Sequence, residues 1–121
     1  NPNLDSFETW PAGTDAPPRL WRLVRGSVSR TSSNVTDGDY AAELDGRMYR
    51  GFQFTSLSTF EIDVNAVNGS AARVYIGGSL VLDLASASAD LNVDVSARGG
   101  VQTVTLEATG GAAVFDNIRV T

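Results

Sequence analysis

The chain has 121 residues, of which 42% are hydrophobic and 19% charged, a composition typical of one globular domain and not of a disordered segment. Nine basic and fourteen acidic residues give a formal net charge of −5, which argues against nucleic acid and anionic membrane surfaces as partners. His, Cys and Lys are absent, so the chain has no Ser-His-Asp triad, no cysteine nucleophile and no imidazole or thiolate metal site. No apolar run approaches 18 residues, and we therefore expect no membrane insertion.

Hydrophobic and polar residues alternate with a period of two along much of the chain, and no apolar stripe with helical spacing continues past two turns. Phe60, Ile62 and Val64, for example, alternate with Glu61 and Asp63. This alternation is typical of strands that bury one face. We expect strands at residues 4–10, 20–25, 27–32, 40–45, 47–55, 59–66, 72–77, 80–84, 91–96, 102–108 and 112–120.

Turn-forming residues separate these strands at short spacing. Asp45-Gly46 and Asn68-Gly69-Ser70 are examples, and the small residues at 85–89 indicate a further loop. Many short strands without intervening helices are typical of antiparallel sandwiches and barrels. The sequence therefore predicts a single all-β domain over residues 1–121, an antiparallel β-sandwich. Its predicted core consists of apolar residues from one face of each strand: Phe52, Phe54, Phe60, Ile62, Val64, Val74, Ile76, Val104, Leu106 and Val114.

Five motifs follow one another along nearly the whole chain, each weak alone but specific in this order. They are Asn3-Leu4-Asp5-Ser6-Phe7-Glu8-Thr9-Trp10; Trp21 after a Pro-rich loop; Ser27-Val28-Ser29 with Val35-Thr36-Asp37-Gly38-Asp39-Tyr40-Ala41-Ala42-Glu43-Leu44; Tyr49-Arg50-Gly51-Phe52-Gln53; and Val114-Phe115-Asp116-Asn117-Ile118-Arg119-Val120. The order resembles the jelly-roll carbohydrate-binding modules of galactose-binding-like fold that accompany bacterial cellulases and xylanases. Similar domains also occur in phage structural proteins. The resemblance implies a jelly-roll sandwich, while its function must be argued from a site.

The resemblance also implies a structural calcium ion that joins the first strand to the last. By motif, Glu8 and Asp116 would be side-chain ligands, and carbonyl groups near Asp37 and Gly38 would complete the set. Calcium accepts six to eight hard oxygen ligands in flexible geometry, which suits such a mixture. The alternative is that Glu8 is a solvated charge at an edge and Asp116 a turn residue.

A polar surface is the second candidate site. Tyr49, Gln53, Glu61, Asp63, Arg73 and Tyr75 alternate out of phase with the core residues of their own strands. We therefore expect all six to share one sheet face and to bind a polysaccharide or glycan. Aromatic rings can pack against the apolar face of a sugar, while amide, carboxylate and guanidinium groups bond its hydroxyls. A solvated face with cross-strand ion pairs is the alternative.

Three further residues leave choices open. Arg50 falls on the apolar face of its strand, so either Gly51 marks a bulge or Arg50 reaches the rim of the sheet. Of the two tryptophans, we expect Trp21 in the core and Trp10 packed beneath a loop.

The function that this sequence favours is non-catalytic. The close carboxylate pairs Asp37/Asp39 and Glu61/Asp63 lie in a turn and along a strand, and a chain of this size leaves little room for a deep cleft, so we expect no enzyme. The leading hypothesis is a carbohydrate-binding module on the outside of a cell. The rival is a phage virion protein that decorates a capsid, or forms part of a tail or fibre, and contacts other capsid or tail proteins or attaches to the host. A ligand-free adhesion domain is a third possibility.

Overall fold

A computed structural model describes residues 4–11, 13, 15–54, 59–94 and 100–120. These residues form nine strands and no helix, so they contain no helix able to cross a membrane. The strands are β1 (Leu4–Asp5), β2 (Arg22–Thr31), β3 (Ala41–Phe54), β4 (Thr59–Val67), β5 (Ala71–Ile76), β6 (Ser79–Leu84), β7 (Ser88–Asp94), β8 (Gly100–Thr109) and β9 (Ala113–Val120).

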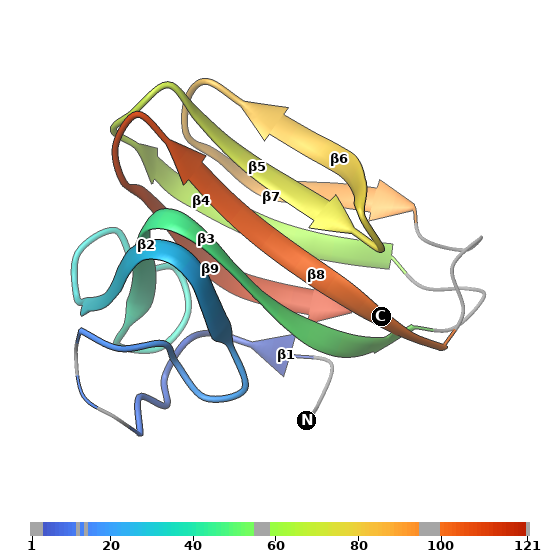
Figure 1. Cartoon of the computed structure of the whole chain (residues 1–121), viewed down its shortest axis with the longest axis horizontal. Helices are drawn as coiled ribbons and strands as arrows, with labels where there is room; N and C mark the ends of the chain where they lie inside the picture. Colours follow the sequence, from blue (N-terminus) through green and yellow to red (C-terminus); the bar gives the residue numbers. More distant parts are fainter. Residues whose placement is uncertain (1–3, 12, 14, 55–58, 95–99, 121) are drawn as a thin grey trace.

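All strand pairs are antiparallel, and they build the two layers seen in Figure 1. The nearer layer has the order β6-β5-β8-β3-β2, and the farther layer has the order β7-β4-β9-β1. Strand β3 joins the layers, because Ala42–Leu44 pairs with β9 and Arg47–Phe54 pairs with β8. This arrangement confirms the predicted all-β sandwich.

The core fills the space between the layers as the alternation predicted. All ten predicted core residues are buried, and nine of them belong to one continuous apolar cluster. Val114 is buried but lies outside this cluster. Trp21 is buried and packs against the rings of Phe7 and Phe52, with centroids 5.5 Å and 6.2 Å away, which confirms its place in the core. Trp10 is half-buried against the cluster and donates from its indole nitrogen to the carbonyl of Phe7.

The predicted breaks between strands at residues 26 and 46 are wrong, because each of these residues lies within a continuous strand. Residues 22–31 form β2 and residues 41–54 form β3, and Gly26 and Gly46 face each other across the pair. Both glycines have positive φ, of 76° and 144°. A Cβ on Gly26 would lie 1.9 Å from the Asp45 carbonyl oxygen, and one on Gly46 would lie 2.1 Å from that of Arg25. The glycines therefore allow a close approach of two strands, where the sequence indicated a turn.

Two other predicted boundaries also change. Strand β1 covers only Leu4–Asp5 of the predicted 4–10, and Phe7 next to it has a φ of 56°. Strand β7 begins at Ser88, inside the predicted loop at 85–89. Serine and alanine have low strand propensity, so the sequence does not indicate a strand here. The start of β7 is set by its pairing with β4, where Ser88 lies opposite Val64.

Arg50 is on the core face of β3, and there is no bulge at Gly51. The register between β3 and β8 runs without a shift from Arg47 to Phe54. The Arg50 side chain is buried, and its Nη1 donates to Asp5 Oδ2 at 2.9 Å. Its guanidinium also lies 4.0 Å from the centre of the Phe52 ring. The charge is therefore placed within the fold by an ion pair with the N-terminal strand.

Candidate functional site

The outward side of the β6-β5-β8-β3-β2 layer carries four of the six predicted binding residues. Tyr49 of β3 and Tyr75 of β5 are both Cα partners of Thr105 on β8, which lies between them. Partners across an antiparallel pair share a sheet face. We call this surface the tyrosine face; its members are Arg22, Arg25, Arg47, Tyr49, Gln53, Arg73, Tyr75, Leu80, Asp83, Val101, Thr103, Thr105 and Glu107.

A charged row crosses this face through the register partners Arg25, Arg47, Glu107, Arg73 and Asp83, and Glu107 lies at its centre. Arg25 and Arg47 approach its Oε2 at 3.0 Å and 3.1 Å, and Arg73 approaches its Oε1 at 3.5 Å. The Tyr75 hydroxyl donates to the same Oε1 at 3.3 Å. Burial favours the neutral form of Glu107, but the hydrogen bond from Arg25 and the charge of Arg47 outweigh it and hold the pKa below the ordinary 4.5.

The two tyrosines on this face differ in what they can offer a ligand. The Arg47 guanidinium lies 5.0 Å from the centre of the Tyr75 ring, and the Tyr75 hydroxyl is bonded to Glu107. Tyr75 is thus partly used by the protein itself. Tyr49 is 36% exposed, and its ring is the more available platform.

Large apolar side chains are exposed mainly here. Five such residues are exposed in the described part of the chain: Leu20, Val24, Tyr49, Leu80 and Val101. Three of them, Tyr49, Leu80 and Val101, lie on the tyrosine face. Their registers place Leu80 beside Tyr75, and Val101 beside Gln53. The face therefore combines apolar patches with hydroxyl, amide and guanidinium groups.

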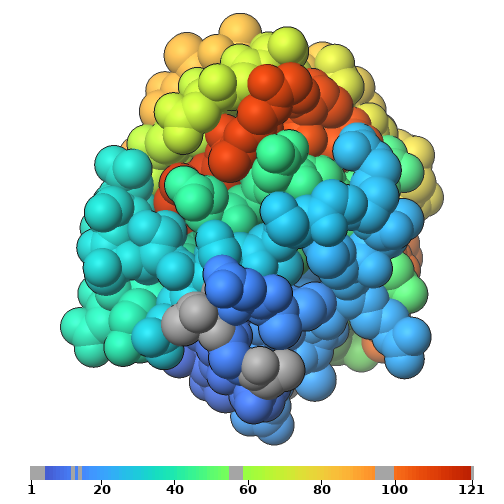
Figure 2. All heavy atoms as spheres, turned by 60° about the vertical axis from the view of Figure 1, so that its left-hand side comes forward, coloured from blue at the N-terminus to red at the C-terminus, as the bar shows by residue number. Residues whose placement is uncertain are grey.

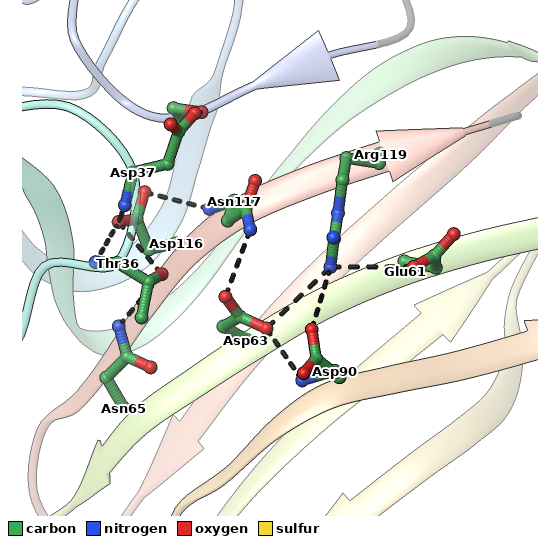
Figure 3. Close-up of polar contacts among 10 residues, drawn as sticks. Thr36, Asp37, Glu61, Asp63, Asn65, Asp90, Asp116, Asn117 and Arg119 are labelled. Carbon is green, nitrogen blue, oxygen red and sulfur yellow. Dashed lines mark hydrogen bonds and ion pairs between the residues drawn. The ribbon is translucent and has the colours of Figure 1, made fainter.

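Glu61 and Asp63 are elsewhere, so the prediction that all six residues share one face is wrong. Both lie on β4, which pairs with β7 and β9 in the other layer. Figure 3 shows Arg119 of β9 pointing toward Glu61, Asp63 and Asp90, with N–O distances of 3.6, 3.8 and 3.7 Å. The turn at 68–70 leads β4 from one layer to β5 in the other, and these two strands do not pair with each other.

The Asp63 side chain is buried and bonded within the protein. It is 3% exposed and accepts hydrogen bonds from the Asp90 amide at 2.7 Å and the Asn117 side chain at 3.1 Å. Burial opposes its charge, but these bonds together with Thr36 and the charge of Arg119 hold its pKa below the ordinary value. Its carboxylate is therefore occupied by the protein.

The four predicted metal residues come together around the segment between β2 and β3. Figure 2 shows the blue N-terminal part of the chain beside this cyan segment. Glu8 accepts hydrogen bonds from the amides of Asp39 and Tyr40, at 2.6 Å and 2.8 Å. A Cβ on Gly38 would lie 2.2 Å from Glu8 Oε1, so the close approach of this carboxylate depends on glycine.

Asp116 holds the other end of the same segment (Figure 3). Its Oδ2 accepts from the amides of Thr36 and Asp37, at 2.9 Å and 3.0 Å, and its Oδ1 accepts from the Asn117 amide at 2.8 Å. Burial raises its pKa above the ordinary value, although these three amides favour the charged form. The side chain of Asp37 accepts a hydrogen bond from the Ser6 hydroxyl.

Both carboxylates thus accept hydrogen bonds from backbone amides of the 36–40 segment, Glu8 near one end and Asp116 near the other. The described residues include no group of three Asp or Glu side chains placed to hold a metal, so a calcium ion here would need the segment's carbonyl oxygens as ligands too. Calcium binding by these residues stays a prediction with a direct test in the Discussion.

Arg25, Arg47 and Glu107 belong to the candidate site although the sequence did not single them out. The alternation around Val104 and Leu106 already places Glu107 on the outward side of its strand. The two arginines were harder to assign, since the register between β2 and β3 shifts between Leu23 and Arg25. Only this bulge brings Arg25 opposite Arg47.

Comparison with known proteins identifies the fold. No family model and no curated protein matches the sequence. Among solved structures, the chain is similar to the CBM36-1 domain of a multidomain xylanase from the hindgut metagenome of Trinervitermes trinervoides. That match has 17% identity and a TM-score of 0.54, and it covers 98% of this chain and 94% of the other. The chain is also similar to TmCBM61 in complex with β-1,4-galactotriose, at 15% identity and a TM-score of 0.52, covering 85% and 88% of the two chains. The chain thus has the jelly-roll β-sandwich fold of carbohydrate-binding modules.

Proposed function

We propose that this chain is a non-catalytic carbohydrate-binding module that binds a polysaccharide or glycan chain on the tyrosine face. The observation that carries the proposal is that three of the five exposed large apolar side chains of the described residues lie on this face, Tyr49 among them. Such patches on a soluble domain commonly mark a binding surface. The similarity to carbohydrate-binding modules supports the same reading.

The chemistry of the face suits a sugar chain. The partly exposed ring of Tyr49 can pack against the apolar face of one sugar. Thr103, Thr105 and Gln53 lie in neighbouring register positions and can exchange hydrogen bonds with hydroxyl groups. The face is a sheet surface open to water, so we expect dissociation constants of roughly micromolar to millimolar.

A glycan array with purified protein tests the proposal, using Tyr49→Ala and a matched tyrosine elsewhere. Tyr40 lies next to β3 and stacks with Arg30, away from the tyrosine face. We expect Tyr49→Ala to abolish glycan binding and Tyr40→Ala to retain it, with both proteins folded by circular dichroism. Equal binding by the two variants, or no glycan bound by the wild type, would refute the proposal.

The proposed function also implies where the protein is located. A module of this kind acts on glycans outside the cell. The phage virion role that the sequence also suggests is the alternative. The genomic neighbourhood distinguishes the two roles: glycoside hydrolase domains beside this chain would favour the carbohydrate-binding module, and head and tail genes would favour the virion protein.

A further inference from the structure

Positive charge is concentrated on one half of the tyrosine face, although the chain as a whole carries −5. Arg22, Arg25 and Arg47 lie around Tyr49, because Arg22 is its Cα partner on β2 and Arg25 is the partner of Arg47. Of these three arginines, Arg25 and Arg47 contact an acidic group, and both share the carboxylate of Glu107. Asp45 follows in the next outward position of β3, beside Ser27.

The arginines of this half have donors to spare. A guanidinium has five N–H groups. Arg25 uses Nη2 toward Glu107, and its side chain is 51% exposed. Arg22 is exposed, and its side chain makes no hydrogen bond or ion pair with the described residues. By contrast, Arg73 at the other end of the row has a second carboxylate partner, Asp83 at 3.3 Å. Unused cationic donors therefore lie next to the most exposed aromatic ring.

Planar guanidinium groups recognise carboxylates with paired hydrogen bonds. This face already holds one carboxylate by its charge, because three arginines converge on Glu107 with one N–O contact each. A sugar packed on Tyr49 would place its substituents against Arg22 and Arg25. A neutral sugar would leave the Arg22 charge without a counter-charge and Arg25 with only the shared carboxylate of Glu107, whereas a uronic acid would supply a further carboxylate.

We propose that the tyrosine face selects polysaccharides whose sugars carry carboxylate groups, with Arg22 and Arg25 beside Tyr49 binding the carboxylate. This inference rests on the proposed function and narrows it to a substrate class. Arg22 is the sharper probe of the two, since Arg25 also neutralises Glu107.

The experiment compares polygalacturonate with the same polymer after chemical reduction of its carboxyl groups. Alginate serves as a second polyuronate and dextran sulfate as an anion of different chemistry. Affinity is measured by calorimetry for the wild type, Arg22→Gln and Tyr49→Ala. Arg19→Gln is the matched control, because Arg19 is an exposed arginine outside the tyrosine face.

We expect at least one polyuronate to bind about tenfold more tightly than reduced polygalacturonate, the scale of one charge-assisted contact. Arg22→Gln should remove most of this preference, Arg19→Gln should keep it, and added salt should weaken it. The inference would be overturned if neither polygalacturonate nor alginate bound more tightly than the reduced polymer. Equal losses in Arg22→Gln and Arg19→Gln, or equally tight binding of dextran sulfate, would also overturn it by showing unspecific attraction.

The failure of the inference differs from the failure of the proposed function. If neutral glycans bind in a Tyr49-dependent manner and polyuronates bind no better, the carbohydrate-binding function stands and the carboxylate preference is refuted. If neither the charged nor the neutral polymers bind and the glycan array is also blank, both proposals are refuted.

Discussion

Arg50 of β3 and Asp5 of β1 form an ion pair with a 2.9 Å contact, and their side chains are only 7% and 13% exposed. Asp5 Oδ2 also accepts a hydrogen bond from the Trp21 indole at 2.7 Å, and Oδ1 accepts one from the Phe7 amide at 3.0 Å. One carboxylate thus connects the first strand, a core tryptophan and the long strand that joins the two layers.

Breaking this pair should destabilise the fold strongly. Asp5→Asn leaves the Arg50 charge without its carboxylate partner in a buried place, and we expect the free energy of unfolding to fall by about 3–5 kcal/mol. Urea denaturation followed by tryptophan fluorescence measures the change. Asp83→Asn is the control, since the Asp83–Arg73 pair is open to solvent and should contribute much less to stability. Similar losses in the two variants would contradict the structural role of Asp5.

The glycine pair between β2 and β3 gives a second prediction. Gly26→Ala and Gly46→Ala would each force a Cβ against a backbone carbonyl while φ stays positive, so we expect a loss of at least about 1–3 kcal/mol each. Gly78→Ala separates the two causes. Gly78 has a φ of 86° but open space around its Cβ, so this variant should show the backbone strain without the clash. Thermal denaturation of the three proteins should therefore place Gly78→Ala closest to the wild type.

Stability should fall at acid pH because of Glu107 and Asp63. The pKa of each carboxyl is lower in the folded protein than its ordinary value of 4.5 or 3.8. The stabilisation is thus complete above that unfolded value and is lost as the pH falls through the folded pKa. Asp116 has a raised pKa and acts in the opposite sense, since its penalty develops as the pH rises past 3.8. The melting temperatures of wild type and Glu107→Gln, measured between about pH 7 and pH 2.5, should converge in acid. A constant difference across that range would contradict the assignment of Glu107.

Calcium removal distinguishes two ways of holding the segment between β2 and β3. If an ion joins Glu8 and Asp116, a chelator lowers the melting temperature of calcium-loaded protein, because an ion that binds only the folded state stabilises it. We expect this decrease, and we expect it to disappear in Glu8→Gln and Asp116→Asn. The same melting curve with and without chelator would instead show that the amide hydrogen bonds to both carboxylates are sufficient.

Period-two alternation by itself determined the all-β class, the predicted core and which side of its own strand each candidate residue occupies. These properties depend on neighbours one or two positions away, so a linear sequence contains them. Which layer a strand joins is decided by pairing between distant segments. Glu61 and Tyr75 alternate in the same way, yet β4 pairs with β9 and β5 pairs with β8, so these residues lie in different layers. In the same way, the convergence of Arg25, Arg47 and Arg73 on Glu107 exists only because a bulge in β2 and the pairing of β8 with β3 and β5 bring them together.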